Sequence, residues 1–480
     1  MADHLTPLDA AFLELEEGDA AAHMHVGWAM LCDPCPQGGA PSLADVQALL
    51  DERLELLPNF LCRLSSPRVG RLDWPTWERD EELDLANHIR HATLPAPGGE
   101  AELHEWIGDF YSHRLDRAHP LWEMILLDGL EGDRWALVAK VHHCLIDGIS
   151  GASVTTVVLD AEPEPEPGSK GVLAAAGLAG NGSGEEHPGT LGRLAAGARA
   201  GVDAALHPRK LRPLLDRSRA LADLLIRDEL HGAPQTSLNV EISGVRRFDA
   251  TAAPLADLKQ IKRQLGGTVN DVVLAATAGG LRRLFAQRGE EVEDCVRAMV
   301  PVSLRQAGES LALGNRVSSL FVELPVAEPD PLLRYHRIAA ASEDLKRAGQ
   351  AGGAEALMEL AGAAPPLIHG VAARIAFAPR LFNLTVTNVP GPPLTLYALG
   401  APVRRVLPLV PIFSGHAVGV AAVSYDGQVS FGLNADRGRV PDLAELRSGI
   451  EDSLDELRRL AGIEPAPDDA SHPAAAAAEN

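Results

Sequence analysis

The chain has 480 residues, 46% of them hydrophobic and 23% charged, a composition typical of a globular protein and not of a disordered one. Its 66 acidic residues outnumber its 43 basic residues, for a formal net charge of −23. This balance leaves no general basic field to attract nucleic acid, so we expect no nucleic-acid partner and only local, apolar contact with any membrane.

The N-terminus and the cysteines indicate where the protein resides. The N-terminal segment MADHLTPLDAAFLELEEGD is acidic and lacks the apolar region of a signal peptide. Nowhere do about 18 uncharged apolar residues run together, so no transmembrane helix is expected. The five cysteines are scattered, as in a reducing compartment. We therefore expect a cytoplasmic protein, with peripheral binding to a membrane or lipid droplet as a further option.

One cysteine pair has the spacing of a redox or zinc motif. Cys32 and Cys35 form a C-x-x-C, but proline and glycine follow it where a redox motif would open a helix. A second pair of ligands for zinc is also missing. We expect neither a redox nor a metal role for these residues.

Apolar periodicity predicts the elements in chain order. In the first half a strand over 23–31 and helices over 42–57 and 101–115 precede a hairpin over 121–143, whose two apolar runs flank a Gly-Asp turn signal. The second half ends in a hairpin over 416–436 with a two-residue Asp-Gly turn, followed by a helix over 440–460. Both halves thus end in hairpin, loop and helix.

Composition shifts divide the chain into segments. Pro-Glu repeats with Ala, Gly and Ser bury too little apolar surface to offset their ordering entropy, which marks a flexible linker. The predicted segments are an N-terminal half over 1–160, the linker over 161–190, a basic helical bridge over 191–235, a C-terminal half over 236–463 and a disordered tail over 464–480.

Two adjacent histidines close the first hairpin, in the stretch VHHCLIDGISG over 141–151. Strand alternation places His143 on the face of Val141, and His142 on the opposite face with Lys140. Helical spacing resumes near Asp147, so the motif lies in a strand-to-helix loop. Free backbone N–H groups at such a helix start favour developing negative charge.

The histidine motif admits three interpretations. His142 and His143 can be half-buried residues that end a strand, with Asp147 as a helix N-cap. They can bind a metal, although no third ligand is evident nearby. They can also be catalytic, since a neutral imidazole can take a proton from a hydroxyl that attacks a carbonyl. Asp147 can then fix an imidazole tautomer or pair with a distant arginine.

With Gly148, the motif resembles the H-H-x-x-x-D-G signature of the CoA-dependent acyltransferase superfamily, which includes chloramphenicol acetyltransferases and peptide-synthetase condensation domains. Further blocks, in this order over nearly the whole chain, resemble the bacterial wax ester synthase/diacylglycerol acyltransferase family. These blocks are LTPLDAAFLELE, HPLWEM at 119–124, TSLNVEISGVRRF at 236–248, TVNDVVLAATAGGLRRL at 268–284, VPVSLR at 300–305, LGNRVSSLFVELP at 313–325 and NLTVTNVPGPP at 383–393.

The resemblance implies an α/β chloramphenicol acetyltransferase-like fold with two subdomains, mixed sheets flanked by helices and an active-site tunnel between the halves. It also implies an O-acyltransferase that moves a fatty acyl group from acyl-CoA to the hydroxyl of diacylglycerol or of a long-chain alcohol. The products would be triacylglycerol or wax ester. Acyl-CoA is then the cosubstrate, with no metal and no redox cofactor.

The family pattern implies roles for the motif residues. His143 would be the general base, within a catalytic set of His142, Asp147 and Gly148. Because CoA leaves as a thiol, no covalent acyl-enzyme is needed, and Cys144 is expected to be a small packing residue. Asn270 would donate a hydrogen bond to the oxyanion.

Other residues would support the site. Arg305 resembles the arginine that pairs with the motif aspartate, here Asp147. Asp271 and Asn270 match the family's Asn-Asp pair, but a cap for the following helix is an equal alternative. Pro120, Leu121 and Trp122 are expected to support the pocket.

Two apolar segments complete the expected architecture. The segment 365–386 is expected to form either an acyl-tunnel wall or lipid-contacting surface, or an interior helix. Prolines and a glycine at 388–393 indicate a rigid crossover between the halves.

Two rival functions remain open at this point. One is a condensation-type acyltransferase that takes its acyl group from a carrier protein. The other is a lipid-binding or droplet-coating protein that keeps the fold without turnover.

Overall fold

The structure is a computed structural model that describes residues 3–5, 7–65, 75–145, 157–165, 232–303, 317–347 and 377–463. Most of the expected linker, most of the helical bridge and the tail lie outside these residues and stay predictions. Asp147, Gly148 and Arg305 also lie outside them.

A six-stranded mixed sheet, ordered β12-β13-β2-β7-β6-β5, forms the N-terminal half. Its strands are β2 (His25–Cys32), β5 (Ile89–Thr93), β6 (Trp122–Leu130), β7 (Arg134–His142), β12 (Tyr397–Ala398) and β13 (Ala401–Leu409). Strands β6 and β7 form the expected hairpin. Its turn, Glu131–Asp133, is a short 3-10 segment in which Gly132 has a φ of 73°, a conformation that glycine adopts without strain.

Three short strands and four helices complete this half. The strands are β1 (Asp3–His4), β3 (Cys62–Leu64) and β4 (Thr76–Arg79), and the helices are α1 (Pro7–Gly18), α2 (Leu43–Arg53), α3 (Leu85–His88) and α4 (Glu100–Ser112). Ser42 and Asp45 form a capping box at the start of α2. The helix expected over 42–57 ends early, because Pro58 disfavours α-helix in the preceding residue and the last turn tightens to a 3-10 helix over Leu54–Leu56.

The C-terminal half has its own six-stranded mixed sheet, ordered β10-β9-β11-β14-β15-β8. Asp426 and Gly427, with φ of 43° and 77°, form the expected two-residue turn between β14 and β15. The strands are β8 (Arg246–Pro254), β9 (Val296–Ser303), β10 (Val317–Leu324), β11 (Leu384–Pro390), β14 (Val418–Tyr425) and β15 (Gln428–Asp436), and the helices are α9 (Leu255–Leu265), α10 (Val269–Gln287), α11 (Pro331–Arg347) and α14 (Leu443–Leu460).

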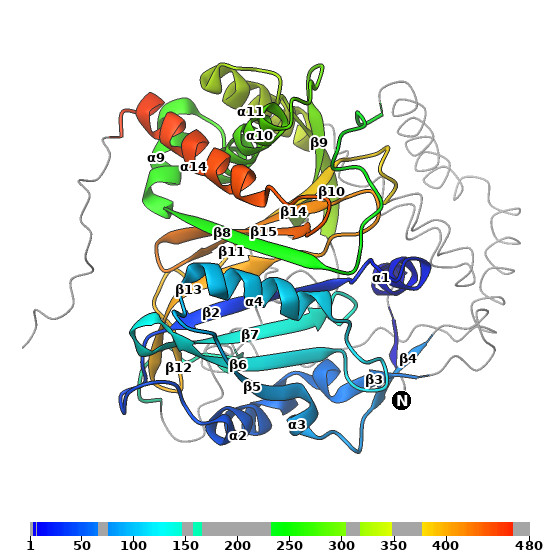
Figure 1. Ribbon diagram of the computed structural model, residues 1–480, viewed down its shortest axis with the longest axis vertical. Helices are drawn as coiled ribbons and strands as arrows, with labels where there is room; N and C mark the ends of the chain where they lie inside the picture. The colour runs from blue at the N-terminus through cyan, green and yellow to red at the C-terminus, as the bar shows by residue number, and fades with distance from the viewer. Residues whose placement is uncertain are drawn as a thin grey trace, which may run out of the picture.

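The two halves are layered against each other. Helices α9, α10, α11 and α14 lie on the outer side of the C-terminal sheet, α2 and α3 lie on the outer side of the N-terminal sheet, and α4 lies between the two halves (Figure 1). Gly108 of α4 packs on the backbone of Arg246 to Phe248 in β8, where a side chain would be crowded. Two α/β halves with mixed sheets flanked by helices are thus confirmed.

The chain also crosses from one sheet to the other. After β11 in the C-terminal sheet it passes through 391–396, enters the N-terminal sheet as β12 and β13, and returns as β14. This is the crossover expected at 388–393. Strand β13 pairs with β2, so a strand from the C-terminal part of the sequence completes the N-terminal sheet. Gly432 of β15 lies against the carbonyl of Pro408 in β13, with no room for a Cβ, so the two sheets approach closely there.

Candidate active site

The two histidines lie where strand β7 ends. His142 is the last residue of β7, and its backbone N–H donates to the carbonyl of Leu121 at 2.9 Å. The expected alternation is confirmed as far as Val141, since the odd-numbered residues of β7 from Trp135 to Val141 belong to one core cluster. His143 follows in a turn and is held by its backbone N–H, which donates to the carbonyl of Met24 at 2.7 Å.

The imidazole of His143 is covered by helix α1. Phe12 stacks on it with ring centroids 3.9 Å apart and an interplanar angle of 26°. Burial lowers the pKa of His143 to about 4. Within the described part of the chain, Nδ1 of His143 has no hydrogen-bond partner outside its own residue. The ring is therefore neutral at physiological pH and can act as a base.

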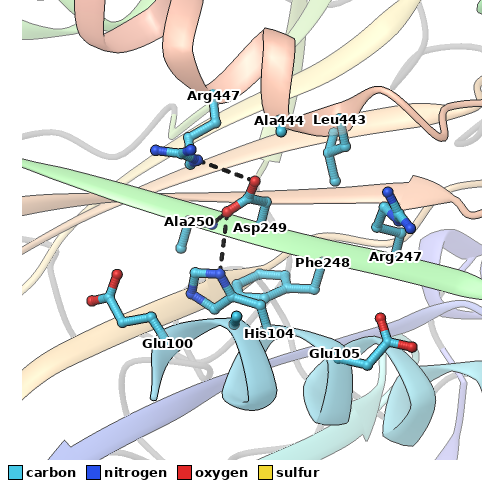
Figure 2. A pocket seen from close by; sticks show the side chains of 11 residues that line it. Glu100, His104, Glu105, Arg247, Phe248, Asp249, Ala250, Leu443, Ala444 and Arg447 are labelled. Atoms are coloured by element: carbon cyan, nitrogen blue, oxygen red, sulfur yellow. Dashed lines mark hydrogen bonds and ion pairs between the residues drawn. The ribbon is translucent and has the colours of Figure 1, made fainter.

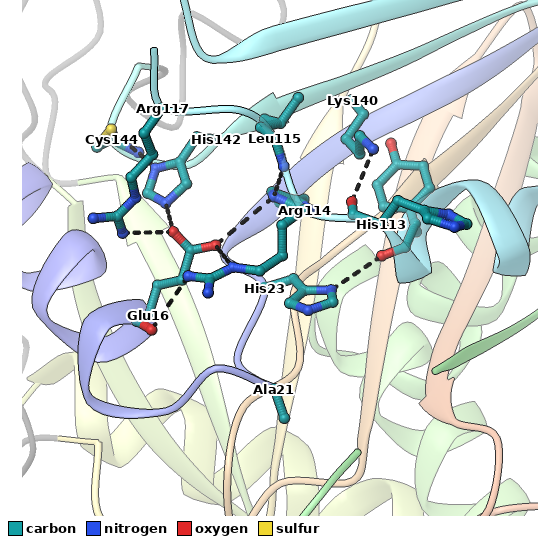
Figure 3. Close-up of polar contacts among 12 residues, drawn as sticks. Glu16, Ala21, His23, His113, Arg114, Leu115, Arg117, Lys140, His142 and Cys144 are labelled. Carbon is teal, nitrogen blue, oxygen red and sulfur yellow. Dashed lines mark hydrogen bonds and ion pairs between the residues drawn. The ribbon is translucent and has the colours of Figure 1, made fainter. Parts of the chain in front are cut away.

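The imidazole of His142 has a different environment. Its Nε2 lies 3.1 Å from Oε2 of Glu16, and the backbone N–H of Cys144 donates to its Nδ1 at 3.1 Å (Figure 3). Because Nδ1 accepts, the proton of the neutral ring must be on Nε2, which donates to Glu16. Both ring nitrogens of His142 are thus engaged, whereas Nδ1 of His143 has no such partner among the described residues.

Glu16 is a buried carboxylate that the sequence analysis did not single out. Its side chain is only 3% exposed, and it also accepts from Arg117 at 2.7 Å and from Arg114 at 3.2 Å. Although burial acts to raise the pKa of Glu16, the hydrogen bond and charge of His142 and the hydrogen bond of Arg117 hold it well below its ordinary value. The signal was present in the sequence, since Glu16 closes the family block LTPLDAAFLELE.

The expected supporting residues on the first hairpin pack beneath the histidines. Leu121 and Trp122 are fully or almost fully buried, and Leu121 supplies the carbonyl that holds His142. The indole N–H of Trp122 donates to the carbonyl of Phe60 at 2.9 Å, and its ring stacks on His88. Pro120 is also buried. These contacts are structural, and none of them points a polar group of Trp122 toward the histidines.

Asn270 and Asp271 lie in the first turn of α10. Asp271 forms a capping box with Thr268, accepting its backbone N–H at 2.7 Å, so the helix-cap alternative holds for Asp271. No described interaction joins Asn270 to His143. Its role at an oxyanion stays a prediction, as does the pairing of Asp147 with Arg305, which lie outside the described residues.

An ion pair fixes the chain just beyond the motif. Arg53 of α2 donates to both carboxylate oxygens of Asp160, at 2.9 and 3.1 Å, and to the carbonyl of Val157 at 3.1 Å. Both partners are almost fully buried. This pair thus holds the described residues 157–160, which follow the motif, against α2.

Aromatic side chains continue from Phe12 into the C-terminal half. Phe377 lies 6.2 Å from Phe12 and 5.5 Å from Phe413, measured between ring centroids. In the segment 365–386, residues up to 376 lie outside the described part of the chain, while Leu381 and Phe382 are buried in the same cluster. These described residues are interior, but they form turns and the start of β11, so the expected interior helix is wrong for them; a tunnel wall stays a prediction.

A surface pocket lies at the junction of α4, β8 and α14 (Figure 2). Nδ1 of His104 lies 3.1 Å from Asp249, whose other oxygen accepts from Nε of Arg447 at 3.2 Å. None of the predicted site residues lines this pocket. The contact of His104 with Asp249 joins α4 of the N-terminal half to β8 of the C-terminal half.

The described residues were searched for groups of side chains that could hold a metal ion and for helices that could cross a membrane. In the described residues, no group of three or more His, Cys, Asp and Glu side chains is arranged to hold a metal ion. In the same residues, none of the helices combines the length and the apolar character needed to cross a bilayer.

The sequence is similar to known proteins over most of its length. Residues 5–273 match the model of the wax ester synthase/diacylglycerol acyltransferase catalytic domain, and residues 313–458 match that of the WS/DGAT C-terminal domain. A probable diacylglycerol O-acyltransferase of Mycobacterium tuberculosis, tgs1, is 33% identical over 461 residues, 95% of this chain and 96% of that protein. Another from the same species, tgs2, is 31% identical over 475 residues, 96% of this chain and all of that protein.

Solved structures agree with these sequence matches. The wax ester synthase/diacylglycerol acyltransferase from Marinobacter aquaeolei VT8 has a TM-score of 0.67 and 28% identity, over 96% of this chain and 100% of that one. The first condensation domain of the calcium-dependent antibiotic synthetase has a TM-score of 0.61 at 18% identity, over 97% of each chain. The latter likeness, at this identity, shows the fold alone.

Proposed function

Since this chain belongs to the wax ester synthase/diacylglycerol acyltransferase family and is an acyltransferase, we propose that it esterifies diacylglycerol or a long-chain alcohol with a fatty acyl group from acyl-CoA. The product is triacylglycerol in the first case and a wax ester in the second. Acyl-CoA is the cosubstrate, and the enzyme meets its lipid substrates at the surface of a membrane or lipid droplet.

His143 is the general base in this proposal. It takes the proton from the acceptor hydroxyl while the hydroxyl oxygen forms a bond to the thioester carbonyl carbon. The C–S bond then breaks, and the CoA sulfur leaves with the proton that His143 returns. No acyl-enzyme forms, so the reaction uses no nucleophilic serine or cysteine.

The environment of His143 is the observation that carries this assignment. Its ring is half-buried, stacked on Phe12 and neutral, and its Nδ1 has no hydrogen-bond partner among the other described residues. His142, with both ring nitrogens engaged by Glu16 and Cys144, is not available for proton transfer in the same way. A strand end at which one neutral imidazole keeps its Nδ1 without a partner among the described residues supports a single-base mechanism.

The remaining roles follow the family pattern. Asn270 donates a hydrogen bond to the oxyanion of the tetrahedral intermediate. Asp147 pairs with Arg305 and shapes the motif loop, and Gly148 allows close approach of the substrate. His142, Pro120, Leu121 and Trp122 hold the strand end that presents His143.

The test is thiol release from palmitoyl-CoA by the purified, chelator-treated protein, with diacylglycerol and hexadecanol offered separately. His143→Ala is compared with His113→Ala, which removes an exposed histidine. We expect acceptor-dependent release that survives chelation, disappears in His143→Ala and persists in His113→Ala. Release that persists in His143→Ala would overturn the assignment of the base, and no release with either acceptor would overturn the proposed substrates.

A further inference from the structure

We propose that Glu16 is a positioning residue for acyl transfer, which acts through His142 and helix α1 to hold His143 in its catalytic place. The inference rests on the proposed function, in which His143 is the general base. It extends that function to a carboxylate outside the histidine motif.

One face of α1 contacts both motif histidines. Phe12 and Glu16 are four residues apart, so they lie on the same side of the helix. Phe12 stacks on His143, and Glu16 accepts the Nε2 proton of His142. A displacement of α1 therefore moves both Phe12, which packs on His143, and Glu16, which binds His142.

Glu16 connects this face to three further segments. Its Oε2 accepts from His142 in β7 and from Arg117, and its Oε1 accepts from Arg114 in the loop after α4 (Figure 3). His25, at the start of β2, lies 3.9 Å away. These segments meet where the carbonyls of Leu121 and Met24 bind the backbones of the two histidines.

We expect Glu16 to hold His142 and the two arginines through both its negative charge and its hydrogen-bond acceptors. The backbone N–H of Cys144 occupies Nδ1 of His142, so Nε2–H needs an acceptor in a site with almost no solvent. The two arginines are only partly buried, and each donates a guanidinium N–H to the buried carboxylate of Glu16. A glutamine at this position keeps an acceptor and the shape but removes the negative charge that both arginines bind, and among the described residues Arg117 alone retains a second carboxylate, that of Glu17.

Loss of this support should appear in the rate of the chemical step. A displacement of the reacting groups by about 1 Å can cost about 100-fold in rate. We expect Glu16→Gln to lower kcat by about 10- to 100-fold, with KM for palmitoyl-CoA changed by less than about threefold. The matched control is Glu17→Gln, because Glu17 is the next residue of the same helix, is exposed, and binds Arg117 without touching His142.

A double-mutant cycle separates positioning from general destabilisation. If Glu16 acts through His142, Glu16→Gln combined with His142→Ala should be no slower than His142→Ala alone, within about threefold. Rates are measured well below the unfolding temperature of every variant, and the 15N spectrum of histidine-labelled protein reports whether His142 keeps its Nε2–H tautomer. A purely structural role would lower the folded fraction and leave kcat per folded molecule unchanged.

The outcomes are distinct. Wild-type kcat in folded Glu16→Gln, or additive effects of Glu16→Gln and His142→Ala, would overturn the inference while the loss in His143→Ala keeps the proposed function. Full activity in His143→Ala would overturn the proposed function and this inference with it. Four results together would establish Glu16 as a positioning residue. In Glu16→Gln, kcat is lower and KM is unchanged. The effects of Glu16→Gln and His142→Ala are coupled, and Glu17→Gln behaves like the wild type.

Discussion

The phenyl ring of Phe12 lies on the imidazole of His143, with their centroids 3.9 Å apart. A helix near the N-terminus thus keeps water from one face of a histidine far along the chain. This contact contributes to the burial that lowers the pKa of His143 to about 4.

The pH dependence of acyl transfer should reflect this burial. A general base works in its neutral form, so kcat/KM should fall only as pH drops through about 4 and stay level from pH 6 to 8. Phe12→Ala admits water beside the ring, so it should raise the pKa of His143 and move the fall in kcat/KM to higher pH. Profiles of both proteins test this, with Phe377→Ala as a control that leaves the stacking partner in place. An unchanged profile in Phe12→Ala would contradict it.

Stability should fall as the pH is lowered from neutrality. Burial lowers the pKa of His23, His143 and His416 to about 4 each, below the 6.5 of the unfolded chain. Between these pH values the unfolded state binds more protons, so each group removes up to about 1.4 kcal/mol of stability per unit of falling pH. Urea unfolding at pH 7.5, 6.5 and 5.5 measures the slope.

His416 offers a variant for this test outside the proposed site. It stacks on Phe382 with centroids 4.1 Å apart, so His416→Leu keeps much of the packing and removes one titrating group. We expect a shallower dependence of the unfolding free energy on pH in His416→Leu, whereas a variant of the exposed His113 should keep the slope. Equal slopes in wild type and His416→Leu would show that His416 does not contribute.

Cys144 should be dispensable for turnover. Burial raises the pKa of its thiol well above the ordinary value, which leaves no thiolate to attack a thioester. Its contact with Nδ1 of His142 includes the backbone N–H, which alanine retains. We expect kcat of Cys144→Ala within about threefold of wild type, as Cys62→Ala should also show. A near-complete loss confined to Cys144→Ala would instead indicate a covalent acyl-enzyme.

The ion pair of Arg53 and Asp160 should support both stability and activity. Arg53→Met removes the bidentate partner of a buried carboxylate, and breaking a buried ion pair typically costs about 3–5 kcal/mol. Replacing both, as Arg53→Met with Asp160→Leu, should recover part of that loss. Arg53 holds Val157 and Asp160, which follow the histidine motif in the chain. We therefore expect kcat to fall in Arg53→Met even at temperatures where the protein stays folded. Urea unfolding and initial rates measure the two effects, and a double variant less stable than Arg53→Met would contradict the account.

The sequence by itself determined the local elements and the identity of the motif. The hairpin at 121–143 and the one that turns at Asp426 and Gly427 follow from residues adjacent in the chain, because strand alternation and turn conformation are local preferences. The helix over Leu443–Leu460 follows from apolar periodicity in the same way. His142 and His143 could be recognised because all the residues of the H-H-x-x-x-D-G motif lie within one short stretch of the sequence.

Tertiary structure alone decided what surrounds the motif. Glu16 and His142 are separated by 126 positions, and although both lie in family blocks, neither block indicates that the two side chains form a hydrogen bond. The pairing of β13 with β2 likewise joins distant parts of the chain. These contacts depend on loop closure and on the burial of many side chains at once, so they arise only when both sheets are assembled.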